Sequence, residues 1–403
     1  MYIASIDFYS KPNPSFHLMT SMMEDVLSSG IEIELIGCRE ENIEKHIPEQ
    51  LEDNDKFQYE LIDVPQVKKS NFIQRYLEGI KYSIKVGKII KRKIEQCDCV
   101  FIQSSPTVLY TIYFARKYAK NKKIIYNIQD MFPGSSIASG VMPQRWMQRI
   151  FYTLQKIAYK KADVITVISE DMKHKVVEQG VDPKKIEVIV NWFDDNSVHE
   201  VKWEDNRFVK KYNMSKDIFY VQYAGTMGYV FDYQAVLSVA DRLKERKNIV
   251  FQMIGMGSQK QVFMMEAKNR QLENIVFLPL EPQEMVSDVY SACSLCYIPL
   301  KKGIIGNSVP SKAGLLMACN RPIITSADIN SFYCRSFKEN KMGIAKDSRD
   351  IDGIVKSIIY LSENKDIGNE LALNGFKYGC NLYSRRYNMQ KYISLFEKIA
   401  RRR

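Results

Sequence analysis

The strongest constraint on the fold is an alternation of short apolar runs with helical stretches, and this alternation occurs in two separate series. Strands that alternate with helices are typical of parallel α/β sheets, so we expect two doubly wound α/β domains. In the first series the expected strands are residues 2–7, 31–36, 99–103, 123–127, 164–168 and 186–189. In the second series they are residues 219–223, 249–254, 275–278, 295–298 and 323–325.

A polar stretch separates the two series. The chain has 403 residues, which exceeds the size at which a single hydrophobic core usually stops growing, so two domains are also expected from length. We expect a first domain over residues 1–195, a hinge over 196–215 and a second domain over 216–380. Residues 381–403 are expected to form a C-terminal helix that returns toward the first domain.

The charge of the chain favours an anionic partner. The formal net charge is +11, which suits a nucleotide-sugar, a phospholipid surface or a nucleic acid. The first residues lack the layout of a signal peptide, and no apolar run reaches the ~18 residues that a membrane-spanning helix needs. The cysteines are scattered, which favours a cytoplasmic protein. Cys293 and Cys296 have a metal-ligand spacing, but nothing completes a set, so we expect buried structural cysteines and neither a metal nor a cofactor.

A Gly- and Ser-bearing loop runs into a short apolar helix and then a strand over residues 303–324. Unpaired backbone N–H groups at a helix start, together with the helix dipole, favour an anion. Lys312 would add a positive charge at the same place. The segment therefore predicts a phosphate site. The loop residues expected around the phosphate are Gly306, Asn307, Ser308, Val309 and Ser311.

The same segment resembles a known motif. The order of Pro310, Lys312 and the following Met317-Ala318 is similar to the donor-binding motif of family-4 retaining glycosyltransferases, which build bacterial capsule, exopolysaccharide and O-antigen. The resemblance implies the GT-B fold, in which two Rossmann-like domains face a central cleft. The first domain would bind the acceptor and the second the nucleotide-sugar. The family normally carries two Glu residues in this motif, whereas this chain has Asn307 and Leu315 at the matching positions.

Two glycine-rich turns strengthen the resemblance. Residues 221–228 look like the strand and turn that open the family's second domain, and residues 253–257 look like its next strand with a Gly-x-Gly end. Glycine is needed where the backbone approaches a bulky ligand, although an ordinary strand-to-helix turn is the other interpretation of the first turn. Tyr229 stands where relatives usually have Arg or Lys. The donor-binding residues implied here are Gly225, Thr226, Gly228, Tyr229 and Gly255.

In the first domain, residues 126–134 resemble the strand end at which the family places an Asp beside the cleft. Polar side chains at the carboxyl edge of a parallel sheet face the crevice in which ligands bind. Asp130 is therefore expected to meet a hydroxyl of the acceptor or of the donor sugar, and a helix N-cap or turn residue is the alternative. Ser15 and His17 are expected on the acceptor side, with a structural role as the alternative for His17.

The resemblance implies that a sugar moves from a UDP- or GDP-linked donor to a lipid-linked saccharide acceptor, with retention. Departure of the nucleoside diphosphate is the main barrier, and cations and N–H groups placed on the diphosphate supply most of the stabilisation. Lys312 and Asp130 are the expected catalytic residues. The missing acidic pair leaves two alternatives, which are a non-catalytic GT-B scaffold that binds a partner and a sugar-nucleotide epimerase.

Two basic aromatic helices are expected in the first domain, over residues 76–93 and 145–161. Helices of this kind bind the surface of an anionic bilayer, and an ordinary amphipathic helix packed on a sheet is the alternative. Together with a lipid-linked acceptor, the pattern predicts a peripheral protein on the inner face of the cell membrane. Nucleic-acid binding is not expected, because no recognised binding motif accompanies the charge.

Overall fold

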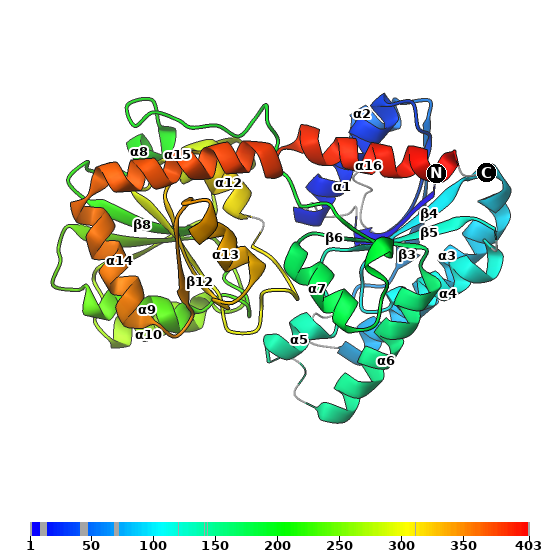
Figure 1. Ribbon diagram of the computed structural model, residues 1–403, viewed down its shortest axis with the longest axis horizontal. Helices are drawn as coiled ribbons and strands as arrows, with labels where there is room; N and C mark the ends of the chain where they lie inside the picture. Colours follow the sequence, from blue (N-terminus) through cyan, green and yellow to red (C-terminus); the bar gives the residue numbers. More distant parts are fainter. Residues whose placement is uncertain are drawn as a thin grey trace. The chain divides into compact units, whose positions relative to one another are not determined.

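The computed structural model forms two compact α/β units (Figure 1). It describes residues 2–8, 14–40, 47–67, 72–119, 121–140, 142, 144–310 and 312–401, with the backbone alone for 2–8, 14, 15, 40 and 72. Unit 1 comprises residues 1–135, 142–191 and 388–403, and unit 2 comprises 136–141 and 192–387. Among the described helices, none is both long enough and apolar enough to cross a bilayer.

Unit 1 is built on a 7-stranded parallel sheet with the order β3-β2-β1-β4-β5-β6-β7. Its strands are β1 (Tyr2–Phe8), β2 (Ile33–Glu40), β3 (Phe57–Val64), β4 (Cys99–Gln103), β5 (Lys123–Ile128), β6 (Val164–Val167) and β7 (Ile186–Val188). Its helices are α1 (Pro14–Ser28), α2 (Glu49–Glu52), α3 (Phe72–Lys93), α4 (Val108–Tyr118), α5 (Gly134–Ala138), α6 (Arg145–Lys161) and α7 (Glu170–Glu178). Figure 1 shows α1 and α2 on one face of the sheet and α3, α4 and α6 on the other. Strand β4 is buried along its whole length because helices cover both faces, which explains its continuous apolar run.

The last helix, α16 (Arg385–Ala400), begins in unit 2 and belongs to unit 1 from Asn388 onward. Its Tyr392 ring packs edge-on against Phe101 of β4, with the centroids 6.1 Å apart. The Tyr392 hydroxyl accepts a hydrogen bond of 2.9 Å from the Asn127 side-chain amide at the end of β5. Phe396 also packs on Phe101, with a centroid distance of 5.9 Å. The end of the chain therefore completes the core of unit 1.

Unit 2 is built on a 6-stranded parallel sheet with the order β10-β9-β8-β11-β12-β13. Its strands are β8 (Phe219–Ala224), β9 (Ile249–Ile254), β10 (Ile275–Leu278), β11 (Leu295–Pro299), β12 (Ile323–Ala327) and β13 (Ile344–Asp347). Its helices are α8 (Arg207–Lys211), α9 (Tyr233–Arg242), α10 (Lys260–Asn269), α11 (Val286–Ser291), α12 (Lys312–Ala318), α13 (Phe332–Glu339), α14 (Ile351–Glu363) and α15 (Lys365–Leu382). Successive residues of β8 enter two different apolar clusters, Tyr220 and Ala224 in one and Val221 and Tyr223 in the other. The sheet is therefore covered on both faces.

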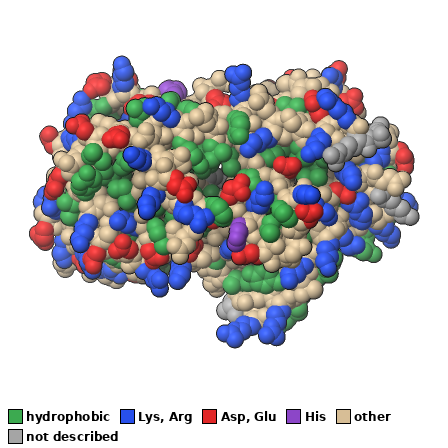
Figure 2. Space-filling model, viewed as in Figure 1, with side chains coloured by type: hydrophobic (Ala, Val, Ile, Leu, Met, Phe, Trp, Pro, Cys, Tyr) green, Lys and Arg blue, Asp and Glu red, His purple; other side chains and the backbone are tan. Residues whose placement is uncertain are grey.

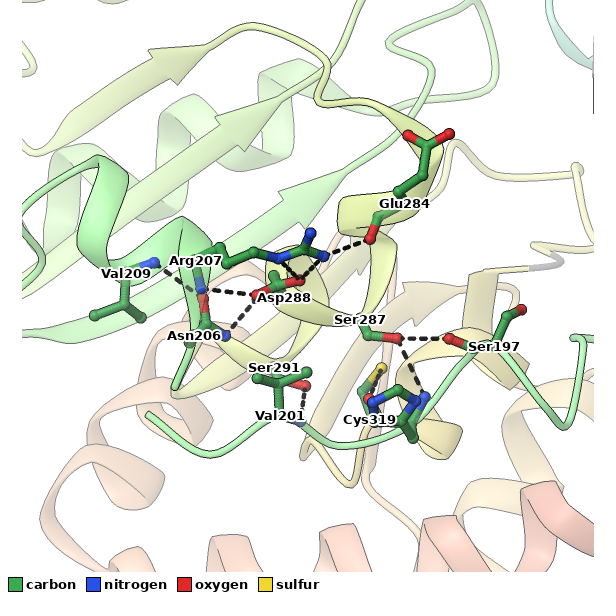
Figure 3. A network of polar contacts seen from close by, with 11 residues as sticks. Ser197, Val201, Asn206, Arg207, Val209, Glu284, Ser287, Asp288, Ser291 and Cys319 are labelled. Carbon is green, nitrogen blue, oxygen red and sulfur yellow. Dashed lines mark hydrogen bonds and ion pairs between the residues drawn. The ribbon is translucent and has the colours of Figure 1, made fainter. Parts of the chain in front are cut away.

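Residues 196–215, which the sequence suggested as a hinge, pack within unit 2 (Figure 3). The Val201 amide donates to the Ser291 hydroxyl at 2.9 Å. The Arg207 amide donates to one oxygen of the Asp288 carboxylate at 2.7 Å, and its guanidinium donates to the other at 2.6 Å. The polarity that suggested a linker thus has another cause, because these groups bond to α11. Apart from residues 136–141, unit 2 spans residues 192–387, whereas the sequence suggested 216–380.

The sequence pattern located the central strands and missed β3 and β13. Both lie at the edge of their sheet, β3 in unit 1 and β13 in unit 2. Strand β3 has buried residues only near its two ends, and every residue of β13 is only partly buried. An edge strand can carry more polar residues than a central strand, so the apolar pattern of β3 and β13 was too weak to indicate a strand.

Candidate functional site

Two glycine turns meet at the carboxyl ends of β8 and β9. Gly225 and Gly255 have φ values of 147° and 132°, which side-chain-bearing residues rarely adopt. The Gly225 amide donates to the Ile254 carbonyl at 2.9 Å. A Cβ atom on Gly255 would lie 2.1 Å from the Gly225 carbonyl oxygen, so only glycine fits there. The two turns are therefore locked together, at the edge of the sheet where α/β folds bind ligands.

The tip of the first turn is open to solvent. Thr226 and Tyr229 are exposed, while Gly228 between them is partly buried. The Met227 amide donates to the Met256 carbonyl at 2.8 Å, which fixes the tip to the second turn. The two exposed side chains, both predicted as donor-binding, offer hydroxyl groups from a rigid backbone.

Lys312 brings a cation to the first turn. Its ammonium nitrogen lies 3.2 Å from the Ala224 carbonyl oxygen and 3.5 Å from the centroid of the Tyr223 ring. A Cβ atom on Gly225 would be only 2.5 Å from this nitrogen, so the glycine makes room for it. Loss of water around the ammonium lowers the pKa of Lys312 to about 7, although the residue as a whole is only partly buried. No carboxylate in the described part of the chain forms an ion pair with Lys312.

The loop before α12 is held by Asp328, which follows β12, and by hydrogen bonds within the loop, and this corrects the phosphate-site prediction for two of its amides. Asp328 accepts hydrogen bonds from the amides of Gly303, at 2.8 Å and 3.0 Å, and of Ile305, at 3.2 Å. The amides of Asn307 and Ser308 both donate to the Ile304 carbonyl, at 2.9 Å and 3.1 Å. The amides of Asn307 and Ser308 were expected to point at a ligand, but they bond within the loop. The structure brings the Lys312 cation and the first glycine turn together.

The other residues predicted from this loop have mixed positions. Asn307 is buried, and its side-chain amide donates to the Gly303 carbonyl at 2.8 Å. Gly306 is buried with a φ of 85°, and Val309 packs against the unit 2 core. Ser311 lies outside the described residues. Leu315, in the position of the family's second Glu, is partly buried and packs against the same core.

The predicted residues of unit 1 lie at the carboxyl edge of its own sheet. Asp130 is exposed and follows β5. The amides of Gln129 and Asp130 donate to the Ser104 hydroxyl, at 3.0 Å and 3.4 Å, and Ser104 follows the neighbouring strand β4. His17 is exposed in α1, with its ring edge-on to Phe16 at a centroid distance of 5.6 Å. Ser15 lies in α1, where only its backbone is described.

Three further residues of unit 2 contact the candidate site and were not predicted from the sequence. Tyr223 lies under the Lys312 ammonium, and Asp328 anchors the loop. Lys260 donates to the carbonyls of Gly255, at 2.7 Å, and Leu278, at 3.3 Å, so it supports the second glycine turn. Asp328 could have been predicted from the sequence, because it directly follows an expected strand and so lies at the carboxyl edge of the sheet.

The cysteine pair lies inside unit 2. Cys293 and Cys296 are buried, with their sulfur atoms 3.2 Å apart. Among the residues that the structure describes, no group of three or more His, Cys, Asp or Glu side chains is placed to hold a metal ion.

Two family models match the chain, one on each unit. The model described as "Glycosyltransferase Family 4" matches residues 27–197, and the model described as "Glycosyl transferases group 1" matches residues 203–378. A probable glycosyltransferase of Pseudomonas aeruginosa, WbjE, is 25% identical over 70% of this chain and 71% of its own length. WcaI of Escherichia coli K12, described as a putative colanic acid biosynthesis glycosyl transferase, is 23% identical over 41% of each chain.

Solved structures share the fold at low sequence identity. A sucrose-phosphate synthase from Thermosynechococcus elongatus has a TM-score of 0.77 at 12% identity and covers 100% of both chains. HepE of Anabaena, in complex with UDP, has a TM-score of 0.74 at 12% identity over 99% of this chain and 100% of its own. The architecture of both units and the two family matches agree. This chain is a glycosyltransferase with the GT-B fold.

Proposed function

We propose that this glycosyltransferase binds a UDP- or GDP-linked sugar on unit 2 and transfers the sugar to a lipid-linked saccharide. The observation that carries the proposal is the Lys312 ammonium, a cation without a carboxylate partner among the described residues, beside two glycine turns. A diphosphate would supply the missing negative charge. Support for the donor class comes from HepE of Anabaena, which was crystallised with UDP and with UDP-glucose.

Lys312 is proposed to stabilise the leaving group. Transfer breaks the bond between the anomeric carbon and the β-phosphate oxygen, so negative charge grows on the diphosphate. A cation already in place at that oxygen stabilises the transition state more than the ground state. The low-water surroundings of Lys312 strengthen this attraction. Thr226 and Tyr229 would add hydroxyl donors from the exposed tip of the first turn.

The donor has to be held without the acidic pair of the family motif. Neither Asn307 nor Leu315 carries a carboxylate that could bind the ribose or the sugar. The Asn307 side chain bonds to its own loop, and Leu315 packs on the core. Loss of a hydrogen bond to a charged group weakens binding by about 1.5–3 kcal/mol. We propose that neighbouring backbone and hydroxyl groups recover part of this binding free energy. Retention of configuration is proposed from the resemblance to family 4.

Asp130 is proposed to contact a hydroxyl of the acceptor or of the donor sugar. Its side chain is exposed at the carboxyl edge of the unit 1 sheet, where a parallel α/β sheet binds ligands. Ser15 and His17 belong to α1 of the same unit and are proposed to lie on the acceptor side.

The acceptor is proposed to be presented at an anionic membrane surface by α3 and α6. Trp146 is 65% exposed and Ile150 is 49% exposed on the outer side of α6, and Lys156 and Lys160 are exposed on the same helix. Helix α3 exposes Ile73 and several lysines in the same way. Figure 2 shows Lys and Arg side chains gathered at the free end of α6 beside an apolar band. Exposed apolar groups with a basic border fit a bilayer interface rich in anionic lipid.

The biological product is proposed to be a bacterial surface polysaccharide such as capsule, exopolysaccharide or O-antigen. Support comes from the matched E. coli relative, named for colanic acid biosynthesis, and from the structural neighbour WaaG, described as involved in lipopolysaccharide biosynthesis. WaaG has a TM-score of 0.69 at 12% identity and covers 98% of this chain. The glycosyltransferase family matches favour transfer over a scaffold or an epimerase.

A transfer assay tests the proposal. Purified protein is incubated with UDP- and GDP-sugars and a short-chain lipid-diphosphate saccharide, and nucleoside diphosphate release and the anomeric configuration of the product are measured. We expect release only when the acceptor is present, and a product with the configuration of the donor. Inverted product would reject retention. Release without acceptor, or conversion of the donor to an epimer, would reject transfer.

A further inference from the structure

Tyr223 lies directly against the ammonium of Lys312. The nitrogen is 3.5 Å from the centre of the tyrosine ring. The ring is buried and packs on Phe231 with a centroid distance of 4.3 Å. The Tyr223 hydroxyl donates to the Thr226 carbonyl at 2.8 Å. The ring is therefore fixed by the core on one side and by the first glycine turn on the other.

We propose that Tyr223 is the positioning residue of Lys312, and that its ring holds the ammonium where the donor diphosphate arrives. The proposal rests on the proposed function and assigns a further residue to the same site. The negative face of an aromatic ring attracts a cation, most strongly where water is excluded. A carboxylate in place of the ring would neutralise Lys312 and repel the diphosphate. A neutral ring stabilises the lysine and leaves its charge for the ligand.

Between pH 6 and pH 9 the Lys312 ammonium changes its protonation, whereas the groups that face it do not. The Ala224 carbonyl accepts both from Lys312 and from the Tyr290 hydroxyl, the latter at 3.3 Å. Among the described residues, the Cys296 thiol is the further titratable group that acts on Lys312. Burial raises the pKa values of Tyr223, Tyr290 and Cys296, so all three are neutral from pH 6 to 9. The ring and the carbonyl thus stabilise the charged lysine without a fixed negative charge.

Fluorine substitution tests the ring without removing it. Tyr223→Phe is made first, and phenylalanines with one, two and three ring fluorines are then incorporated at position 223, since each fluorine weakens the negative face of the ring. The affinity for UDP and GDP is measured by calorimetry at pH 6 and pH 8. The same series at Phe251, a fully buried residue of the same core cluster, is the matched control.

At pH 8 we expect the nucleotide affinity to fall by about threefold to tenfold across the series at position 223. At pH 6 the loss should be much smaller, because the lysine is then protonated before the ligand binds. Fluorination at Phe251 should leave the affinity unchanged. Affinity that is independent of the number of fluorines, or a loss that is equal at the two pH values or at the two positions, would overturn the proposal.

A ligand-free measurement covers the case in which the unsubstituted protein binds neither nucleotide, a result that would reject the proposed donor. Urea unfolding is then compared at pH 6 and pH 9, with and without Lys312→Met. Weakening the ring lowers the pKa of Lys312 further, so the fluorinated protein should gain about threefold more in folding equilibrium constant between the two pH values. Lys312→Met should abolish this gain. An equal gain in both backgrounds would overturn the role of Tyr223.

Discussion

Lys312 carries a charge that is costly to folding, and we propose that the same charge serves ligand binding. Its ammonium has a carbonyl, a ring and a glycine as neighbours, and it has lost part of its water. The lowered pKa, about 7, measures the penalty of charging it in the free protein. An arriving diphosphate relieves that penalty. We therefore propose that the charge of Lys312 is kept for an anionic ligand, because no carboxylate among the described residues pairs with it.

Replacing this cation separates chemistry from folding. We expect Lys312→Ala to reduce transfer by at least about 100-fold, because the charge acts mainly as the diphosphate leaves. The melting temperature should be unchanged or higher, since the substitution removes a poorly solvated charge. Turnover and thermal melting are measured together. Lys302→Ala, at an exposed lysine of the same loop, is the control and should behave as wild type. Full turnover in Lys312→Ala would remove this residue from the site.

The sequence singled out Lys312 and the glycines as candidates because a lysine and a glycine-rich turn are the residue types that bind phosphate. It could not predict the internal bonding of Asn307 and Ser308, because which carbonyl an amide reaches depends on the path of the loop. The role of Tyr223 was hidden for a related reason. A tyrosine inside an apolar strand looks like a core residue, and only the fold brings it together with Lys312, the first residue of α12 and almost ninety positions away.

At the scale of elements, the site depends on two strand ends that are bonded to each other. We expect Gly255→Ala to destabilise the protein by about 3 kcal/mol or more and to abolish nucleotide binding, because the new Cβ would collide with the Gly225 carbonyl. Gly180→Ala is the control, since Gly180 also has a positive φ but has open space around it. It should cost about 1–2 kcal/mol. Equal urea midpoints for the two variants would contradict the locked turns.

Helix α12 allows a test of the lost acidic pair. We expect Leu315→Glu to destabilise the protein by about 1–3 kcal/mol, since Leu315 packs against the core, and to change donor affinity only modestly. Asn307→Glu should in addition disturb the loop that Asn307 holds. Urea unfolding and calorimetry with UDP and GDP check both variants. A wild type that binds no nucleotide, together with a variant that does, would show a degenerate site instead.

The elements that the sequence predicted well are those whose environment is uniform. Strands β4 and β9 were predicted with their observed bounds, because both lie inside a sheet, are almost entirely buried and are mostly apolar. Edge strands β3 and β13 were missed because most of their residues are only partly buried or exposed. Residues 196–215 were predicted to be a hinge because they are polar. In the structure, polar groups of this segment form hydrogen bonds to α11. Composition alone does not reveal where a polar group finds its partner.

At the scale of the whole molecule, the net charge of +11 gives the proposed membrane contact a test. We expect salt-sensitive binding to vesicles of anionic lipid, weakened by about 30-fold or more when Lys156→Glu and Lys160→Glu are combined, at about 1 kcal/mol per lysine removed. Lys247→Glu with Lys268→Glu, at exposed lysines of unit 2, changes the net charge equally and is the control. Vesicle flotation at two salt concentrations provides the measurement. Equal recovery with neutral and anionic lipid would reject the electrostatic contact.

The central claim is that unit 2 binds a nucleoside diphosphate through Lys312, and calorimetric titration with UDP and GDP from pH 6 to pH 9 tests it most directly. Binding takes up a proton on Lys312, so its full contribution is present below the free-protein pKa of about 7 and is lost as the pH rises above it. We predict binding of at least one nucleotide, with an affinity that falls by up to about tenfold per pH unit above pH 7 and an uptake of protons. In Lys312→Ala, the affinity should be weak at every pH. Binding of neither nucleotide, or an affinity that is the same in both proteins across this range, would contradict the account.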